Sequence, residues 1–461
     1  MELNVRIKNF GKIRNADVAI RPFTVLTGCN SSGKSFVTRG LYSILYTLNQ
    51  DLVFRHINSK LVAIRSWMDD LMGAIPRLSQ SDISVIEDFE RTAAYLQGQM
   101  AQQFDFLSLL KSRDLLLTFD PSAEQLEQHL QALKIQLKAG KGTKYRAVAD
   151  SFLDLEHDLK EFRRSLRDWP GVYEDTLSNE IRKAFCGNFQ TNNAKHLVSD
   201  YSFDHFVLDG ETSVKVLPDG EVDFHIRPEV LDSAYRLRNV VYLESPVYFK
   251  MRQSLQELRV YSFSLARRGA VNPVPKYFYD LDNLLTAVLP DAPEKFTRIA
   301  EKIEDIINGR LVLTPQGEIV YQEDGRNPVS LNMASSGIAN LGILALLLRR
   351  NVLDEGSFLF IDEPEINLHT TWQHVMVQIL LDLSEAGVNV VIATHSLDMM
   401  HRLEHIVSEM EPEEAQSKVS VNRLSSEGET LPTTGSVLTD IYEAKQVLGA
   451  PYIDLMRERL P

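Results

Sequence analysis

The sequence predicts an α/β fold with β-rich N-terminal strands and a large helical insertion, and three observations support this prediction. Three apolar runs of strand length, at residues 23–27, 358–361 and 390–394, are each followed by polar residues. A glycine-rich turn follows the first run and leads directly into an amphipathic stretch. The long segment 36–190 has an almost wholly helical pattern. Buried apolar runs that alternate with helical segments are typical of a parallel sheet covered by helices.

The composition restricts the class of protein. No apolar run approaches the roughly 20 residues needed to span a bilayer, and residues 1–5 favour a strand over a signal peptide. The two cysteines, Cys29 and Cys186, cannot form a disulfide framework. We therefore expect a cytoplasmic protein with no membrane partner. The net charge of −14 disfavours sequence-independent binding of nucleic acid over the whole surface.

The first functional motif is the glycine-rich turn, residues 28–35, which matches G-x-x-x-x-G-K-[ST] between a strand and a helix. In such a phosphate-binding loop (P-loop), backbone N–H groups point at phosphates and the helix adds its positive N-terminal dipole. We expect Lys34 to reach the β- and γ-phosphates and Ser35 to hold Mg²⁺. The predicted nucleotide-binding residues are Asn30, Ser31, Ser32, Gly33, Lys34, Ser35 and Phe36.

The second motif is the apolar run 358–361 followed by Asp362 and Glu363. An aspartate at the tip of a buried strand suits a Walker B residue, which contacts Mg²⁺ directly or through water. Glu363 would then face the γ-phosphate and act as general base on the attacking water. Taken alone, the motif also allows a structural alternative in which acidic residues end a strand in solvent.

The third motif is His395, which follows the apolar run 390–394. A lone histidine is usually a surface or core residue, but ligands of open α/β sheets collect at the edge where such a strand ends. We therefore expect His395 to sense the γ-phosphate. The predicted catalytic residues are Lys34, Glu363 and His395.

A fourth segment, Ser335-Ser336-Gly337, precedes a helical run from Ile338 to Arg350. Such a turn is either an anion site formed by free amides and a hydroxyl, or an ordinary helix N-cap. Its place 26 residues before Asp362 favours the anion site, with Ser336 and Gly337 as its residues.

In chain order, the P-loop, the Ser-Ser-Gly turn, the Asp362-Glu363 pair and His395 resemble the motifs of an ABC-type ATPase of the SMC and OLD branch. That branch also has the Glu-Pro-Glu-x-x-Leu-His pattern of residues 363–369. The resemblance implies ATP and Mg²⁺ as cofactors and a homodimer, or a higher oligomer, in which two ATP molecules lie between two heads. Each ATP would contact the P-loop of one subunit and Ser336 and Gly337 of the other. Residues 365–369 correspond to a loop that crosses to the partner subunit.

The sequence departs from this pattern at one place. ABC heads usually have a glutamine after a strand near the metal, whereas the best candidate strand, Val240 to Leu243, is followed by Glu244. The sequence therefore leaves the remaining Mg²⁺ ligand open.

The expected domains are an ATPase head, residues 1–50 and 190–461, and a helical assembly lobe, residues 51–189. Helix breaks are expected at Asp120-Pro121, at Gly140-Lys141-Gly142 and at Pro170-Gly171. Turns at Asp209-Gly210, Asp219-Gly220, Gln316-Gly317 and Asp324-Gly325 predict β-hairpins.

The helical lobe also contains a run of basic residues. Residues 134–146 carry five Lys or Arg and no acidic residue, and Arg163, Arg164 and Arg167 follow. This pattern fits either a nucleic-acid contact, with Lys138, Lys141 and Lys144 as its test positions, or a solvated helical face.

The 66 residues after His395 contain no Asp-x-Asp pair, so we expect no Toprim-type nuclease within this chain. The chain resembles the ATPase subunits of anti-phage systems such as PARIS and Septu. This resemblance implies a sensor that controls a separate effector protein, a nuclease, in response to a phage-derived trigger. The alternative is an SMC-like DNA-repair or chromosome-associated ATPase that binds DNA. A transporter subunit is disfavoured because Lys34 and Asp362 are 328 residues apart.

Overall fold

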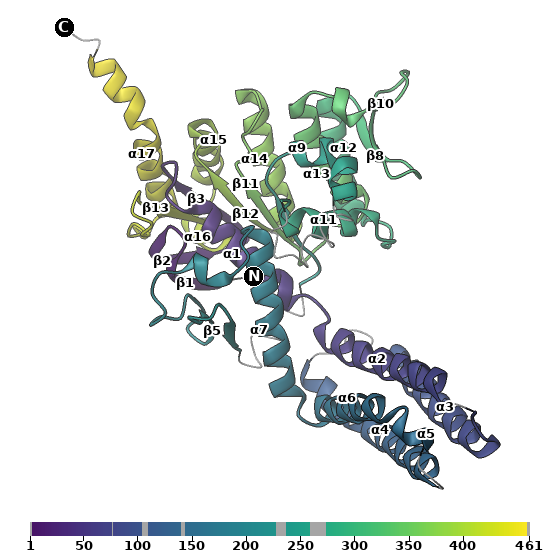
Figure 1. Cartoon of the computed structure of the whole chain (residues 1–461). Coiled ribbons are helices and arrows are strands. Elements are labelled where there is room, and N and C mark those ends of the chain that lie inside the picture. Colours follow the sequence, from purple (N-terminus) through teal and green to yellow (C-terminus); the bar gives the residue numbers. More distant parts are fainter. Residues whose placement is uncertain are drawn as a thin grey trace. The chain divides into compact units, whose positions relative to one another are not determined.

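The structure, a computed structural model, divides the chain into two compact units (Figure 1). The head unit comprises Met1–Asn49 and Ser178–Pro461, and the helical unit comprises Gln50–Leu177. The second boundary therefore falls near residue 178, before the position at residue 189 that the sequence suggested. The residues described are 2–75, 77–103, 109–139, 143–226, 237–258 and 273–458.

A five-stranded parallel sheet forms the centre of the head unit, in the order β13-β3-β12-β11-β7. Its strands are β3 (Phe23–Gly28), β7 (Val240–Leu243), β11 (Phe358–Asp362), β12 (Asn389–Thr394) and β13 (Val419–Leu424). Asp362 is opposite Ala393, and Thr394 is opposite Thr27. This register places the ends of β3, β11 and β12, and thus the three motifs that follow them, at one edge of the sheet.

Helices cover both faces of this sheet, which explains why its strands are apolar without alternation. On one face, Phe360 and Tyr242 pack against Tyr42 of α1 (Lys34–Leu48). On the other face, Leu359 and Val390 belong to a large apolar core. That core also contains residues of α12 (Glu294–Ile307), α13 (Ser336–Arg349), α14 (Thr370–Glu385), α15 (Leu397–Ser408) and α17 (Val437–Glu458).

A second, antiparallel sheet carries the N-terminal strands, in the order β2-β1-β4-β5-β6. Its strands are β1 (Leu3–Phe10), β2 (Ile13–Ile20), β4 (Phe206–Leu208), β5 (Thr212–Val216) and β6 (Val222–His225). Asp209 and Gly210 connect β4 to β5 with φ of 48° and 74°, the left-handed values that a tight hairpin turn needs. The predicted α/β class with β-rich N-terminal strands is confirmed.

A third, three-stranded sheet precedes α13, in the order β10-β9-β8. Its strands are β8 (Arg310–Leu313), β9 (Ile319–Gln322) and β10 (Val329–Ser330). The other helices in the described part of the head are η1 (Ala194–Leu197), α9 (Val247–Lys250), α11 (Lys276–Thr286), η2 (Leu331–Met333) and α16 (Pro412–Lys418). Nowhere in the described ranges is there a helix with the length and apolar character that a membrane crossing requires.

The helical unit consists mainly of long helices whose buried residues repeat every three and four positions, with one four-residue helix, α5, among them. These helices are α2 (Leu52–Ala74), α3 (Gln80–Gln103), α4 (Leu109–Lys138), α5 (Thr143–Arg146) and α6 (Ala149–Arg167), and α7 (Trp169–Asn188) continues into the head unit. In α4 the buried positions are Leu116, Phe119, Ala123, Leu126, Leu130, Leu133 and Leu137. This heptad spacing, which α6 repeats from Phe152 to Leu166, is that of coiled-coil packing.

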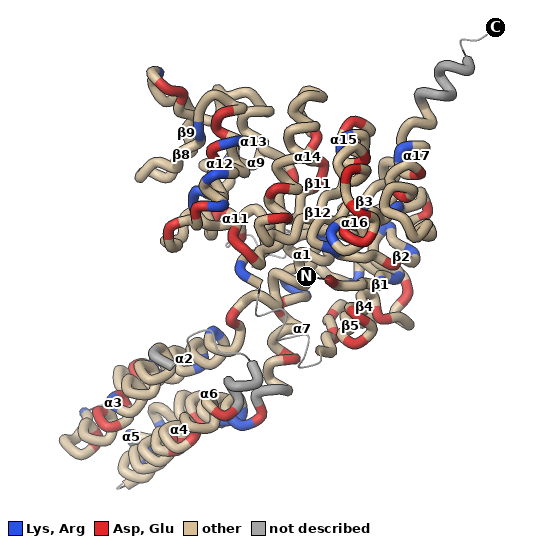
Figure 2. Tube along the Cα trace, turned by 180° about the vertical axis from the view of Figure 1, so that it is seen from behind, with Lys and Arg blue, Asp and Glu red and all other residues tan. Residues whose placement is uncertain are grey.

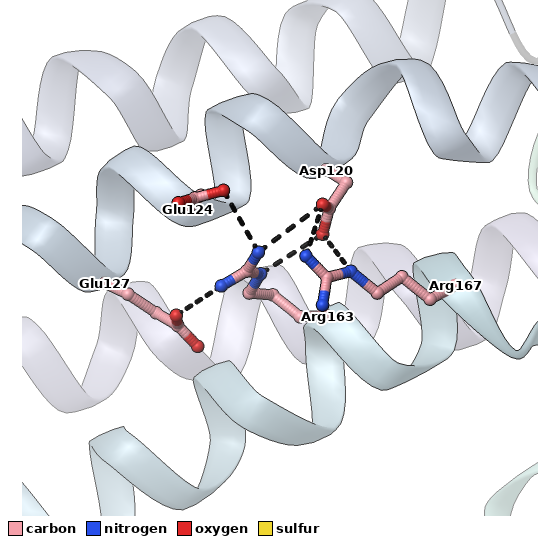
Figure 3. Close-up of polar contacts among 5 residues, drawn as sticks. All are labelled: Asp120, Glu124, Glu127, Arg163 and Arg167. Carbon is pink, nitrogen blue, oxygen red and sulfur yellow. Dashed lines mark hydrogen bonds and ion pairs between the residues drawn. The ribbon is translucent and has the colours of Figure 1, made fainter.

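The helix break predicted at Asp120-Pro121 is wrong, because α4 runs through Pro121. Proline removes one backbone hydrogen bond from a helix, but side-chain contacts hold α4 together on both sides of it. Arg163 of α6 donates to Asp120 at 3.1 Å and to Glu127 at 2.5 Å, and Arg167 donates to Asp120 at 2.7 Å (Figure 3). The break predicted at Pro170-Gly171 falls just after the observed helix boundary, since α6 ends at Arg167 and α7 begins at Trp169. Residues 140–142 lie outside the described residues.

This charge cluster gives a stability prediction. Replacing Arg163→Met should lower the unfolding free energy by about 1–3 kcal/mol, between the values for exposed and buried pairs, because Asp120 and Glu127 lose a partner. Arg163 has a side chain that is only 14% exposed. Urea unfolding of the full chain, followed by circular dichroism, measures the change.

The neighbouring residue supplies a matched control. Arg164 is 58% exposed and lies 3.9 Å from Glu161, so Arg164→Met should change stability by less than about 0.5 kcal/mol. Equal effects of the two substitutions would show that the cluster does not stabilise the unit. Burial alone would raise the pKa of Asp120, but Arg167 and Arg163 hold it below its ordinary value near 3.8. The contribution is therefore complete above that value and disappears as pH falls through the lowered pKa.

Candidate functional site

The P-loop connects β3 to α1, and its backbone conformation requires glycine at two positions. Gly28 and Gly33 have φ of 153° and 98°. A Cβ atom at Gly28 would lie 2.4 Å from the Leu424 carbonyl oxygen, and one at Gly33 would lie 2.5 Å from Ile13 Cδ1. Neighbouring backbone and side-chain atoms therefore fill the space beside these two glycines. A larger residue at either position would displace the loop.

Lys34 begins α1 with its ammonium group turned back to the loop. Its Nζ donates to the carbonyl oxygens of Gly28 and Cys29, at 2.9 and 3.0 Å. Burial lowers the pKa of Lys34, and the nearby carboxylates of Glu363, Glu365 and Asp362 oppose that shift. Lys34 is thus a buried ammonium group held at the loop by two backbone carbonyls. Such a cation at the start of a helix fits a group that binds phosphate.

The other residues predicted to bind nucleotide differ in their exposure and in their contacts. Asn30, Ser31 and Ser35 are exposed, whereas the Ser32 hydroxyl is buried and has no hydrogen-bond partner among the described residues. An unpaired buried hydroxyl is costly unless a ligand completes it, so Ser32 fits a phosphate contact. The ring of Phe36 stacks on Phe189 at 5.4 Å, which gives it a packing role.

Asp362 ends β11 in a buried cluster of hydroxyl groups. Thr38 Oγ1 and the Tyr242 hydroxyl donate to its two oxygens at 2.8 and 2.6 Å. Burial raises the pKa of Asp362, and the hydrogen bonds from Tyr242, Thr38 and Ser35 oppose the shift. A carboxylate beside the Ser35 hydroxyl is the oxygen donor set that Mg²⁺ prefers, so these two residues fit a metal site.

Glu363 leaves the strand in a strained conformation. Its φ is +53°, in the left-handed region that non-glycine residues adopt at a cost, and its N–H donates to the Ala393 carbonyl at 2.8 Å. The side chain is 41% exposed, so solvent reaches the carboxylate. His395 Nδ1 lies 3.7 Å from that carboxylate.

His395 follows β12 and lies closest to a carboxylate that the sequence analysis did not select. Glu365 Oε1 accepts from the His395 backbone N–H at 2.9 Å and lies 3.2 Å from Nδ1. Burial raises the pKa of Glu365. The Glu-Pro-Glu motif could have pointed to Glu365, since Glu365 is its second carboxylate. The sequence alone, however, does not show that His395 is its partner.

The turn predicted to contact the second ATP begins α13. Ser335 caps the helix by accepting from the Ile338 N–H at 3.2 Å, and Ser336 is half-buried. Gly337 is buried, and a Cβ atom there would lie 3.0 Å from the Trp372 ring. One turn later, the Asn340 amide donates at 3.2 Å to the carbonyls of residues 364 and 366. The N-terminal part of α13 is therefore hydrogen-bonded to the loop that follows β11.

Glu244 is the residue that the sequence analysis compared with the usual glutamine of ABC heads. It follows β7, the neighbour of β11, and pairs with Arg39 of α1 and with the Tyr277 hydroxyl. These two partners engage both carboxylate oxygens. Glu244 therefore links the segment after β7 to α1. The groups that contact Asp362 are instead hydroxyls, including that of Tyr242.

The basic residues of the helical unit are mostly paired within it. Besides Arg163, carboxylate partners lie within 4.0 Å of Lys134, Lys144, Arg164 and Arg167. Lys138 lies over the Tyr145 ring at 4.4 Å, and Lys141 lies outside the described residues. Figure 2 shows both acidic and basic residues on the helices of this unit. This arrangement favours a solvated helical face over a nucleic-acid contact.

Comparison with solved structures finds SMC head domains of low identity. The head domain from Thermotoga maritima is 11% identical with a TM-score of 0.35, and 94% of this chain aligns with 99% of that chain. The head domain from Pyrococcus yayanosii, with a coiled coil and joint, is 13% identical with a TM-score of 0.33, covering 96% and 98% of the two chains. No curated protein matches the chain.

A protein-family model matches residues 23–399, which include the P-loop, Asp362, Glu363 and His395. Its description is "AAA domain, putative AbiEii toxin, Type IV TA system". The matched segment comprises most of the chain and contains β3, β11 and β12 with the motifs that follow them. The chain therefore belongs to this AAA-domain family of P-loop ATPases.

Proposed function

We propose that this protein binds and hydrolyses ATP with Mg²⁺, pairs its heads around the nucleotide, and controls a separate effector nuclease in anti-phage defence. One observation carries the catalytic part of the proposal. The P-loop, Asp362, Glu363 and His395 come from three neighbouring parallel strands and meet at one sheet edge. These groups supply an anion site, a metal site and a base within reach of one another.

The residues divide the chemistry among them. Lys34 exchanges its two loop carbonyls for phosphate oxygens when ATP binds, and the Ser32 hydroxyl gains the partner it lacks. Ser35 and Asp362 would hold Mg²⁺, which would neutralise charge on the nucleotide phosphates. The exposed carboxylate of Glu363 takes a proton from the attacking water. His395 contacts the γ-phosphate.

Head pairing completes the site in this proposal. Ser336 begins α13 with the free amides of a helix N-terminus, a favourable place for the γ-phosphate of ATP bound to a partner subunit. Asn340 links this helix to the loop after Glu363. A change at the partner's nucleotide can therefore reach the loop beside the catalytic carboxylate. A homodimer, or a higher oligomer of paired heads, is the expected active form.

The regulatory part of the proposal is supported by the family description, which names a toxin of a toxin–antitoxin system. Such systems consist of more than one protein. The defence role, the phage-derived trigger and the separate nuclease remain inferences from this family and from the resemblance of the motifs.

Coexpression with the neighbouring open reading frame tests this part. We expect a complex of defined mass that contains both proteins, measured by light scattering with ATP and with the Glu363→Gln variant. A monomer–dimer equilibrium that excludes the neighbour and retains DNA in an ATP-dependent, salt-sensitive manner would instead support the SMC-like alternative. Matched samples without nucleotide separate ATP-driven assembly from constitutive assembly.

A further inference from the structure

Glu365 is a buried carboxylate with a specific partner at the proposed catalytic edge. Its side chain is 7% exposed, whereas the His395 side chain is 41% exposed. Burying a carboxylate is costly unless hydrogen bonds or a cation compensate for the loss of water. His395 compensates for this cost at one oxygen only, since its backbone N–H lies 2.9 Å and its Nδ1 lies 3.2 Å from Glu365 Oε1. Glu365 Oε2 is buried and has no hydrogen-bond partner among the described residues.

The loop that carries Glu365 is fixed on both sides. Glu363 and Asn367 have φ of 53° and 60°, so the chain turns sharply before and after Glu365. The Asn340 amide holds the carbonyls at positions 364 and 366, and the Leu368 N–H donates to the Glu365 carbonyl at 3.1 Å. The Glu365 carboxylate therefore has a defined position next to the residue that follows β12.

This position decides how His395 presents its ring. With Nδ1 directed at a carboxylate, the proton lies on Nδ1 and Nε2 is left for another partner, as in carboxylate–histidine pairs at metal sites. Glu363, at 3.7 Å from Nδ1, is the second carboxylate near the ring. Lys34 is the cation that interacts with both carboxylates from α1. A neutral ring in this orientation has no Nε2 proton to donate to a phosphate oxygen.

We propose that Glu365 is a positioning residue for His395: its carboxylate accepts from Nδ1–H and so orients the ring for Nε2–H to donate to the γ-phosphate of ATP. The inference rests on the proposed function, because it takes His395 as the γ-phosphate contact. The imidazolium then lies between two anions, the Glu365 carboxylate and the phosphate. Glu365 acts only through His395.

A double-mutant cycle on the full chain tests this dependence. Glu365→Gln should lower kcat by about 10-fold or more, the size of effect that loss of a histidine's carboxylate partner has at other sites. The KM for ATP should change by less than about threefold. In a His395→Ala background, Glu365→Gln should have no further effect, because its target is gone. A purely structural role would instead give the same loss of kcat in both backgrounds and would overturn the proposal.

Glu409→Gln is the matched control for the loss of kcat. Glu409 lies 4.0 Å from His405 Nδ1 on the exposed surface of the head, so its substitution should leave kcat and KM unchanged.

The outcomes separate this inference from the proposed function. An equal loss of kcat in the wild-type and His395→Ala backgrounds overturns the inference alone, whereas a wild-type chain without ATP turnover overturns both. Thermal melting establishes whether each variant folds. If Glu365→Gln does not, Glu365→Asp keeps the charge on a shorter side chain, and its loss of kcat should disappear in the His395→Ala background. A loss that persists in that background would contradict the proposal.

Discussion

Glu363→Gln should retain ATP binding while hydrolysis slows by roughly 10²-fold or more, the usual contribution of a positioned general base. The glutamine amide has nearly the same shape as the carboxylate but cannot accept the proton of the attacking water. The side chain is 41% exposed and packs against little, so the substitution should leave the fold intact. Unhydrolysed ATP should then trap the paired heads.

Phosphate release and light scattering measure these two effects. Glu385→Gln, which changes an exposed carboxylate at the end of α14, is the control and should behave as wild type. Rapid turnover in Glu363→Gln would remove Glu363 from the role of base. Slow turnover without a shift in mass would keep that role but contradict ATP-dependent pairing of the heads.

Lys34→Ala should weaken ATP binding itself, by about 10-fold or more, because a charge-assisted hydrogen bond contributes about 1.5–3 kcal/mol. In the structure, the Lys34 ammonium is held beside the P-loop carbonyls, within reach of any phosphate that enters the loop. The substitution removes both the charge and the donor. Titration with a fluorescent ATP analogue measures the affinity directly, without depending on hydrolysis.

Lys418→Ala removes a surface lysine that pairs with Glu414 on α16, and it should bind the analogue as wild type does. Its comparison with Lys34→Ala shows whether the loss is specific to the P-loop. If Lys34→Ala binds the analogue as tightly as wild type, the assignment of residues 28–35 as the phosphate site is wrong.

The sequence predicted the elements in which local signals agree with the global fold. The strands β3, β11 and β12 are continuous apolar runs, since both faces of the sheet are covered, and each ends where its motif begins. The turn residues Asp209 and Gly210 predicted a hairpin that the structure contains. The heptad pattern of α4 was present in the sequence as well, but Pro121 suggested a break that packing and the Arg163 contacts overcome.

By itself, the sequence determined the fold class and the P-loop, Walker B and histidine motifs, because short spacing rules govern strands, turns and phosphate loops. Only the tertiary structure decided which side chains surround these motifs. Thr38, Tyr242 and Asp362 are separated by hundreds of residues yet share hydrogen bonds, and Glu365 meets His395 across two neighbouring strands. Strand order and register set such contacts, since parallel strands far apart in sequence bring their ends to one edge, and local sequence patterns do not encode that order.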